Sequence, residues 1–324
     1  MSKRLLFLLA LMPMMLSAEV KMPSIFGSRM VLQREQVNPV WGWAAPGEKV
    51  TVSFAAQKHS AIAGKDGAWR VKLQPLKANA KGQTMVIAGS NKLEFNDVLV
   101  GEVWICSGQS NMAWSVDRAY DPDLESLTAK FPNIRLISVP PVGTQEPQSD
   151  FQGEWVAATP ESVMSFSAVG FFFGRTLHQA LDVPVGLIDN AWGGSAAEAW
   201  IRRGLLDKLP AAAPYMAQWK NTEATYDHEK TMATFEVRLK KWQTAATASR
   251  KAGKPVPRRP RNPRNPLTGQ HRPGNLYNGV LKPFIGYGIR GAIWYQGESN
   301  SARAKAYRDV FPLMIQNWRE EWGQ

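Results

Sequence analysis

From Gly101 onward, short apolar runs alternate with stretches of helical spacing, and this rhythm narrows the possible folds more than any other feature. Runs expected to form strands lie within residues 103–108, 134–139, 183–195 and 288–300, and helical spacing appears at 167–181 and 306–322. Strands that alternate with helices pair in parallel, and the loops at their carboxyl ends form the binding crevice. The sequence therefore predicts an α/β domain with its site at that edge of the sheet.

A different pattern fills residues 19–98, where short β-rich segments are separated by turn sequences such as APGEK, GKDGA and KGQ. Short, partly alternating strands joined by such turns are typical of antiparallel sheets. We expect a small β-domain here, a sandwich or jelly roll without catalytic residues, followed by the α/β domain over residues 99–324.

An insertion over residues 203–273 interrupts the α/β pattern. Its first part has a helical pattern, and its second part is basic and rich in proline: residues 238–272 carry 11 Lys or Arg and no acidic residue. Such a charge could attract nucleic acid or an anionic surface. The segment has few aromatic residues, however, and the rest of the chain is near neutral. We therefore expect a solvated, semi-extended loop and no nucleic-acid partner.

Residues 1–18 have the pattern of a secretory signal peptide. Lys3 and Arg4 precede the apolar stretch Leu5–Leu16, and small residues that fit a cleavage site follow. This stretch is too short to span a bilayer, and no later stretch is apolar enough to do so. We therefore expect an exported protein, secreted or periplasmic, without a membrane span.

Cys106 is the single cysteine, which excludes an intrachain disulfide. No histidine stands at a spacing that would suggest a Cys–His pair. Because Cys106 lies in an apolar run, we expect a buried small hydrophobic side chain rather than a nucleophile.

Three loops that follow apolar strands share a composition. They are CSGQSNM at 106–112, NAWGGSAAE at 190–198 and WYQGESN at 294–300, and each mixes glycine with side-chain amides or hydroxyls. In a parallel sheet, all three can converge on one crevice. Ester hydrolysis requires such a set, because a hydroxyl must attack the carbonyl while donors stabilise the oxyanion that forms.

The first loop supplies a hydroxyl at Ser110. The backbone N–H groups of Ser110 and Gly193 and the side-chain amide of Gln296 can act as oxyanion donors. Each residue also has an ordinary interpretation, since a serine after a strand is often a turn or N-cap residue and paired glycines often mark a tight turn. Three tryptophans flank the loops and could either stack on sugar rings or fill the core: Trp114, Trp192 and Trp294.

These motifs resemble those of the sialate O-acetylesterase family of SGNH-type hydrolases, which is related to carbohydrate esterases that deacetylate xylan. The similarity covers nearly the whole chain and rests on GEVWICSGQSNM, NAWGGSAAEAW, LYNGVLKPF followed by GAIWYQGESN, and the N-terminal stretch that begins SIFGSRMVLQREQV. The resemblance implies a three-layer α/β/α fold, an O-acetylated sialic acid or an acetylated plant-type glycan as substrate, and neither a metal nor an organic cofactor.

At the matching positions, the resemblance implies that Ser110 is the nucleophile and that Gly193 and Gln296 complete the oxyanion hole. Asn111 and Glu298 would be supporting loop residues. The implied reaction removes an acetyl group from a carbohydrate through an acetyl-enzyme at Ser110.

The sequence departs from the family where the base of the catalytic triad is expected. The family carries an Asp-x-x-His block near its C-terminus, after further sheet elements, and no Asp-x-x-His occurs in this chain. A serine hydroxyl without a base is a weak nucleophile at neutral pH. His271 precedes a stretch that leads back into the α/β domain, so it is the candidate for a substitute base; the other histidines are His59, His178 and His228.

Three interpretations of the whole chain follow. We expect a truncated product of an active esterase family, because the sequence ends before the block that carries the acid–base pair. Alternatively, the chain is a carbohydrate-binding remnant that has kept the crevice and lost the base. The third interpretation is a fragment that misfolds because its sheet lacks a strand and leaves an open edge.

Overall fold

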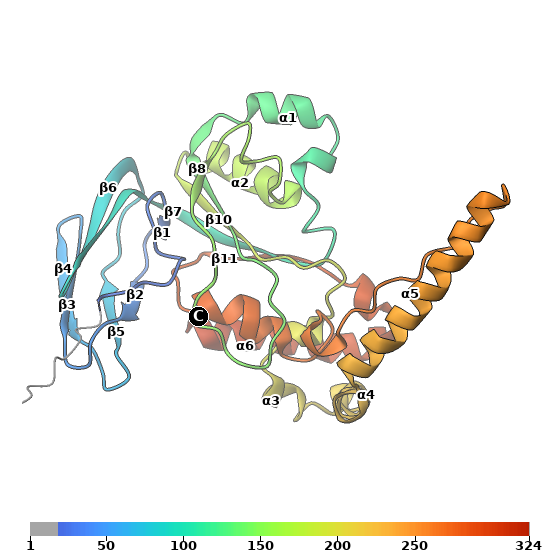
Figure 1. The fold of residues 1–324 in the computed structure, drawn as a ribbon. Coiled ribbons are helices and arrows are strands. Elements are labelled where there is room, and N and C mark those ends of the chain that lie inside the picture. Colours follow the sequence, from blue (N-terminus) through green and yellow to red (C-terminus); the bar gives the residue numbers. More distant parts are fainter. Residues whose placement is uncertain (1–18, 324) are drawn as a thin grey trace, which may run out of the picture.

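The computed structural model describes residues 19–323, so the expected signal peptide lies outside the described residues. The main feature is a nine-stranded sheet in which β7 (Lys92–Gly108) is the longest strand. Hydrogen-bonded neighbours run in the order β4, β3, β6, β7, β10, β8, β9, and both β1 and β11 also pair with β7. Strand β7 thus joins an antiparallel half to a parallel half (Figure 1).

The antiparallel half and a separate two-stranded sheet form the predicted N-terminal β-domain. Its strands are β1 (Val31–Gln33), β2 (Asn38–Trp43), β3 (Lys49–Phe54), β4 (Gln57–Ile62), β5 (Ala68–Leu73) and β6 (Asn79–Ala88). Strand β1 is the exception to the antiparallel pattern, because it pairs in parallel with β7. Strand β2 pairs antiparallel with β5, while β3 pairs antiparallel with β4 and β6. Every second residue of β2, β3 and β5 is buried, so the two sheets enclose a common core.

The boundary expected between residues 98 and 99 falls inside β7. The first part of this strand, from Lys92 to Val100, pairs with β6, and a later part, from Glu102 to Cys106, pairs with β10. One uninterrupted strand therefore connects the two halves without a linker.

The other half has the predicted parallel pairing, except at its edge strand. Its strands are β7, β8 (Phe131–Ser138), β10 (Val185–Asp189), β11 (Gly291–Tyr295) and the antiparallel edge strand β9 (Val156–Ala158). Helix α2 (Ala168–Leu181) covers one face of this half, and α6 (Ala304–Trp322) lies on the other side (Figure 1). This three-layer α/β/α arrangement confirms the predicted fold class.

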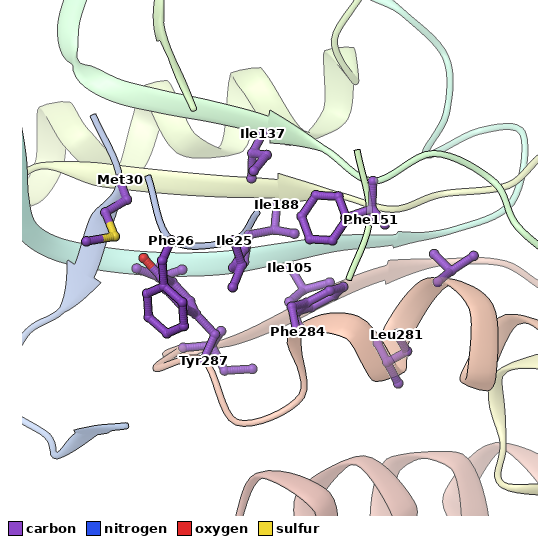
Figure 2. Packing of buried hydrophobic residues seen from close by; sticks show 14 of the residues in the cluster. Ile25, Phe26, Met30, Ile105, Ile137, Phe151, Ile188, Leu281, Phe284 and Tyr287 are labelled. Atoms are coloured by element: carbon purple, nitrogen blue, oxygen red, sulfur yellow. The ribbon is translucent and has the colours of Figure 1, made fainter. Parts of the chain in front are cut away.

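Neighbouring residues of the parallel strands point to opposite faces and build two cores, because side chains alternate along a strand. The core on the α6 side, part of which is shown in Figure 2, includes Ile105, Ile137, Ile188 and Phe284. The core under α2 takes the adjacent positions Cys106, Leu136 and Leu187. Both faces of the sheet are therefore apolar and packed, so a catalytic site can form only at the ends of its strands.

The predicted insertion is helical at first and irregular afterwards. Helices α3 (Arg203–Leu206) and α4 (Ala213–Thr225) lie near the α/β half, whereas α5 (His228–Lys251) projects away from it (Figure 1). Residues 238–251 of the basic segment belong to α5, which corrects the expectation of an extended loop for that part. The residues that follow return along α5, where the Trp242 indole N–H donates to the carbonyl of Pro257 at 2.7 Å. The chain thus comes back to the α/β half as an extended loop.

Shorter elements complete the described chain. They are α1 (Pro122–Thr128), a π-helical turn over Tyr277–Leu281, and 3-10 turns over Val116–Arg118, Ala197–Trp200, Pro210–Ala212, Pro266–Thr268, Lys282–Phe284 and Glu298–Arg303. Neither α1 nor β9 was predicted from the sequence. Within residues 19–323, no helix combines the length and apolar character needed to cross a membrane.

Candidate active site

Ser110 lies in a tight turn that follows β7. The backbone N–H of Gln109 donates to the carbonyl of Tyr295 at 2.9 Å, and that of Ala113 donates to the carbonyl of Gln109 at 2.9 Å. The first bond continues the contact between β7 and β11, and the second closes a helical turn around Ser110. Ser110 is exposed, whereas Gln109 is buried. The turn therefore presents Ser110 at the carboxyl end of β7.

Gly108 is the point where the three predicted loops meet. Its φ is 138°, and a side chain on it would clash with the carbonyl of Tyr295 in the third loop. Its own carbonyl accepts hydrogen bonds from the second loop, from the Trp192 N–H at 3.1 Å and the Ser195 hydroxyl at 3.2 Å. The structure thus brings the three loops together around this glycine.

Gly193 faces Ser110 across the crevice. A methyl group built on Gly193 would lie 3.7 Å from the Cβ and 3.8 Å from the Cα of Ser110. Within the described part of the chain, the backbone N–H groups of Ser110 and Gly193 donate no hydrogen bond, so both are available to a substrate oxygen. Two free N–H groups beside a hydroxyl are what an oxyanion hole requires.

Gln296, the predicted third donor, already has partners in the protein. Its Nε2 donates to the carbonyl of Ser195 at 3.0 Å and to Oδ1 of Asn300 at 2.7 Å, which uses both amide hydrogens. Its Oε1 is buried and has no partner among the described residues. Gln296 therefore ties the third loop to the second. Its donation to an oxyanion stays a prediction, and it requires the amide to leave one of these acceptors.

Three residues that the sequence analysis did not select support this contact. Asn300 accepts the Ala197 N–H at 3.0 Å through Oδ1, and its Nδ2 donates to Glu198 at 2.8 Å. Glu198 is 1% exposed and pairs with Arg303 at 3.3 Å, which balances its buried charge. Glu198 and Asn300 are the last residues of the second and third loops, so the polar composition that singles out Gln296 also marks these two side chains.

The two predicted supporting residues contact each other. The Asn111 Nδ2 donates to Oε1 of Glu298 at 2.8 Å. This bond connects the residue after Ser110 to the third loop, at the exposed rim of the crevice. An effect of this bond on the orientation of Ser110 stays a prediction.

The three tryptophans have different surroundings. Trp114 is 49% exposed, so its ring is accessible to a ligand. Trp192 is half-buried and packs against the core from the second loop. Trp294 packs edge-on against Trp200 and Trp318, the latter in α6. Trp294 is half-buried, so stacking of its ring on a sugar beside Ser110 stays a prediction.

No histidine forms a hydrogen bond with Ser110 in the part of the chain that the structure describes. His59 lies in β4, His178 in α2 and His228 at the start of α5, and each is hydrogen-bonded to a residue close to it in the sequence. Residues 19–323 also contain no group of three or more His, Cys, Asp or Glu side chains arranged to hold a metal ion.

His271 lies on the segment that returns to the second loop. The preceding residue, Gln270, places its Nε2 at 3.4 Å from the carbonyl oxygen of Gly193. Burial lowers the pKa of His271, and the charge of Arg303 lowers it further, while Glu198 acts in the opposite direction. His271 is therefore a histidine that is readily kept neutral, and it directly follows the residue that contacts Gly193.

Cys106 is buried near the end of β7, as predicted. Burial first, and then the charge of Asp189 on the paired strand β10, raise the pKa of its thiol well above the usual range. A buried, protonated thiol is a poor nucleophile, which leaves Ser110 as the nucleophile candidate of this loop.

The chain is similar in sequence to curated sialate O-acetylesterases. The human protein is 28% identical over 318 residues, which cover 92% of this chain and 52% of that protein. The mouse protein is also 28% identical, with 92% of this chain and 55% of that protein covered. This chain thus spans about half the length of the curated relatives it matches. No family model matches it.

A solved structure is similar over the same extent. The crystal structure of a carbohydrate acetylesterase from Xanthomonas citri superposes with a TM-score of 0.73 at 30% sequence identity, covering 94% of this chain and 58% of that one. The sequence and structure similarities together confirm the predicted resemblance to the sialate O-acetylesterase family.

Proposed function

We propose that this chain is a serine esterase that removes O-acetyl groups from carbohydrates. The observation that carries the proposal is the exposed Ser110 facing Gly193, with both backbone N–H groups free, in a chain whose relatives are acetylesterases. In this reaction the Ser110 hydroxyl attacks the acetyl carbonyl, and the sugar hydroxyl leaves. Water then hydrolyses the acetyl-enzyme.

The two free N–H groups stabilise the charge that forms on the carbonyl oxygen. Donors of Ser110 and Gly193 are fixed by the turn after β7 and by the bonds of the second loop to Gly108, so they need little rearrangement during the reaction. Gln296 would add a third donor if its amide left Ser195 or Asn300 for the substrate oxygen.

The reaction needs a base to take the proton of Ser110. The sequence has no Asp-x-x-His, so the histidine to test first is His271, which follows the residue in contact with Gly193. We propose His271 as the base that this chain itself can supply. Movement of the His271 side chain toward Ser110 would be required, since no hydrogen bond joins the two residues in the described structure.

The finer substrate assignment is also a proposal. The curated relatives carry the name sialate O-acetylesterase, which favours an O-acetylated sialic acid. An acetylated xylan-type glycan is the alternative, because the solved relative is described only as a carbohydrate acetylesterase. The basic n-region and apolar stretch of residues 1–18 support export, to the periplasm or the medium.

A second candidate function is carbohydrate binding without catalysis. It is favoured by the absence of a hydrogen bond between Ser110 and a histidine among the described residues. In this case the crevice would hold an acetylated glycan without cleaving it.

Acetyl release from p-nitrophenyl acetate, measured beside the Ser110→Ala variant, tests the proposal. We expect a rate in the unsubstituted protein that falls by several orders of magnitude in the variant. Equal rates in the two proteins would contradict catalysis by this chain and favour the binding function. Release of acetate from O-acetylated sialic acid and from acetylated xylan, compared under the same conditions, then identifies the substrate.

A further inference from the structure

A cavity of about 520 Å³ opens between helix α4 and residues 264–271 of the returning loop. We propose that this cavity, called here the insertion pocket, binds the sugar that carries the ester, and that Arg264 on its wall selects sugars with a carboxylate. The proposal rests on the proposed esterase function and adds the place and the charge of the sugar subsite.

The insertion pocket lies directly beside the candidate oxyanion hole. Gln270 lines the pocket, and its side chain contacts the Gly193 carbonyl at 3.4 Å. The carbonyl of Gln270 accepts the Ala196 N–H at 3.2 Å. Gln270 therefore contacts the second loop on both sides of Gly194. A sugar in the pocket would have its acetyl group within reach of Ser110, which faces the same glycine.

The opposite wall connects to the third loop. Arg303 lines the pocket, and its guanidinium lies 4.0 Å from the centre of the Tyr215 ring. The same guanidinium pairs with Glu198, which holds Asn300 and through it Gln296. Both sides of the insertion pocket are thus joined to the loops that surround Ser110.

The pocket wall suits a sugar that carries a negative charge. Polar groups able to bond sugar hydroxyls come from Gln218, Thr222, Asn265 and Gln270. Two arginines line the cavity, and among the described residues no acidic side chain lines it. On a negatively charged sugar, a carboxylate is the group whose two oxygens match the paired N–H donors of an arginine guanidinium.

Arg264 is the arginine whose charge is left for a ligand. Arg303 is already balanced by Glu198. Arg264 is exposed, and within residues 19–323 it forms no ion pair. The substrate's carboxylate would therefore be the partner of Arg264, while neutral glycans would leave it in water.

The insertion is held firmly enough to form a defined site. Glu223 of α4 accepts two bonds from Arg203, at 2.6 and 2.9 Å, and a third from Arg272 at 2.8 Å. In addition, the Tyr215 hydroxyl donates to the carbonyl of His271 at 2.8 Å. These bonds fix α4 to both ends of the insertion, which positions the wall before a ligand binds.

Binding of N-acetylneuraminic acid and of its neutral methyl ester, measured by calorimetry on the intact Ser110→Ala protein, tests the proposal. We expect the acid to bind about tenfold more tightly than the ester, as an ionic hydrogen bond would produce. Arg264→Gln should remove this difference. Arg261→Gln is the matched control, because Arg261 is exposed on the same segment but does not line the pocket, and it should keep the difference.

Equal affinities for acid and ester, no detectable binding of either at millimolar concentration, or a preference that survives Arg264→Gln would each overturn the proposal. The measurement needs no acetyl release. An inactive protein that prefers the acid through Arg264 would therefore contradict the esterase function alone, and an active esterase without this preference would contradict the subsite alone.

Discussion

A methyl group on Gly193 would lie 3.7 Å from the Cβ of Ser110, which is an ordinary contact distance and not a clash. Gly193→Ala should therefore fold normally, yet place a methyl group where the acetyl carbonyl has to enter. We expect an unchanged melting temperature and a kcat/KM for acetyl esters about 100-fold lower, similar to the loss of an oxyanion donor.

The neighbouring glycine provides the control for this substitution. Gly194 has a φ of 74°, which a residue with a side chain adopts only with strain. Gly194→Ala should lower the melting temperature, at a cost of about 1–2 kcal/mol. A Gly193→Ala variant that keeps full activity would show that this face of the crevice does not receive the substrate.

Gly108→Ala should destabilise the protein more than either of these changes. The added Cβ would meet the carbonyl of Tyr295 at a φ of 138°, so β7 and β11 would have to separate at the point where the three loops meet. We expect a cost of at least about 3 kcal/mol in urea unfolding. Gly204→Ala is the matched control, since a Cβ there meets no atom, and its stability should be unchanged or slightly higher.

The strand ends and the chemistry of the loops could be predicted from the sequence, because both are local. The run that ends at Gly108 is apolar, and Ser110 follows it within a glycine- and amide-containing loop. Parallel pairing then leaves one edge of the sheet where such loops can meet. The structure has this arrangement, with Gly108 bonded to the second loop and packed against the third.

Features that depend on contacts between distant residues could not be predicted in this way. The orientation of Gln296 is set by Ser195, which lies 101 residues earlier in the chain. The position of Trp294 is set by its contacts with Trp200 and Trp318. The sequence around a tryptophan does not distinguish a ring that packs in the core from a ring that stacks on a sugar. The insertion pocket likewise depends on contacts between residues far apart in the sequence, such as those of Glu223 with Arg203 and Arg272.

Glu198→Gln should impair catalysis through the position of Gln296. The substitution removes the negative partner of Arg303 and weakens the acceptor of Asn300, whose Oδ1 holds the Gln296 amide. We expect a loss of about 1–3 kcal/mol in the free energy of unfolding and a decrease in kcat that exceeds the change in KM. Urea unfolding and steady-state kinetics measure the two effects.

An exposed ion pair is the control for Glu198. Glu94 pairs with Lys92 at the surface, so Glu94→Gln should change the stability by less than about 0.5 kcal/mol and leave the kinetics unaltered. Equal kinetic effects of Glu198→Gln and Glu94→Gln would rule out a positioning role for Glu198.

The pH profile tests His271 as the base. Burial, followed by Arg303, lowers the pKa of His271 from the ordinary value of 6.5. A neutral base is therefore available at lower pH than for a free histidine, and kcat/KM should stay high as the pH falls through 6.5 and decrease only below it. His271→Gln should abolish the activity, and with it the decrease of kcat/KM at low pH. His59→Gln, in the β-domain, should leave both the activity and its pH dependence intact. An unaltered profile in His271→Gln would exclude this histidine as the base.

Asp189→Asn should make stability less dependent on pH. Burial raises the pKa of Asp189 from 3.8 to about 7, so the folded state retains a proton that the unfolded state releases. Near pH 3 both states are largely protonated and the carboxyl costs little; as the pH rises through 3.8 towards 7 the unfolded state ionises, and the fold loses stability until the folded pKa is passed. The asparagine carries no such charge and can still accept the Ala191 N–H. The variant should therefore equal the unsubstituted protein near pH 3 and exceed it at about pH 8, by up to about 4 kcal/mol in urea unfolding. Asp309→Asn, exposed on α6, should show no such divergence. A difference between Asp189→Asn and the unsubstituted protein that is constant across this range would mean that Asp189 binds no more protons in the folded state than in the unfolded state.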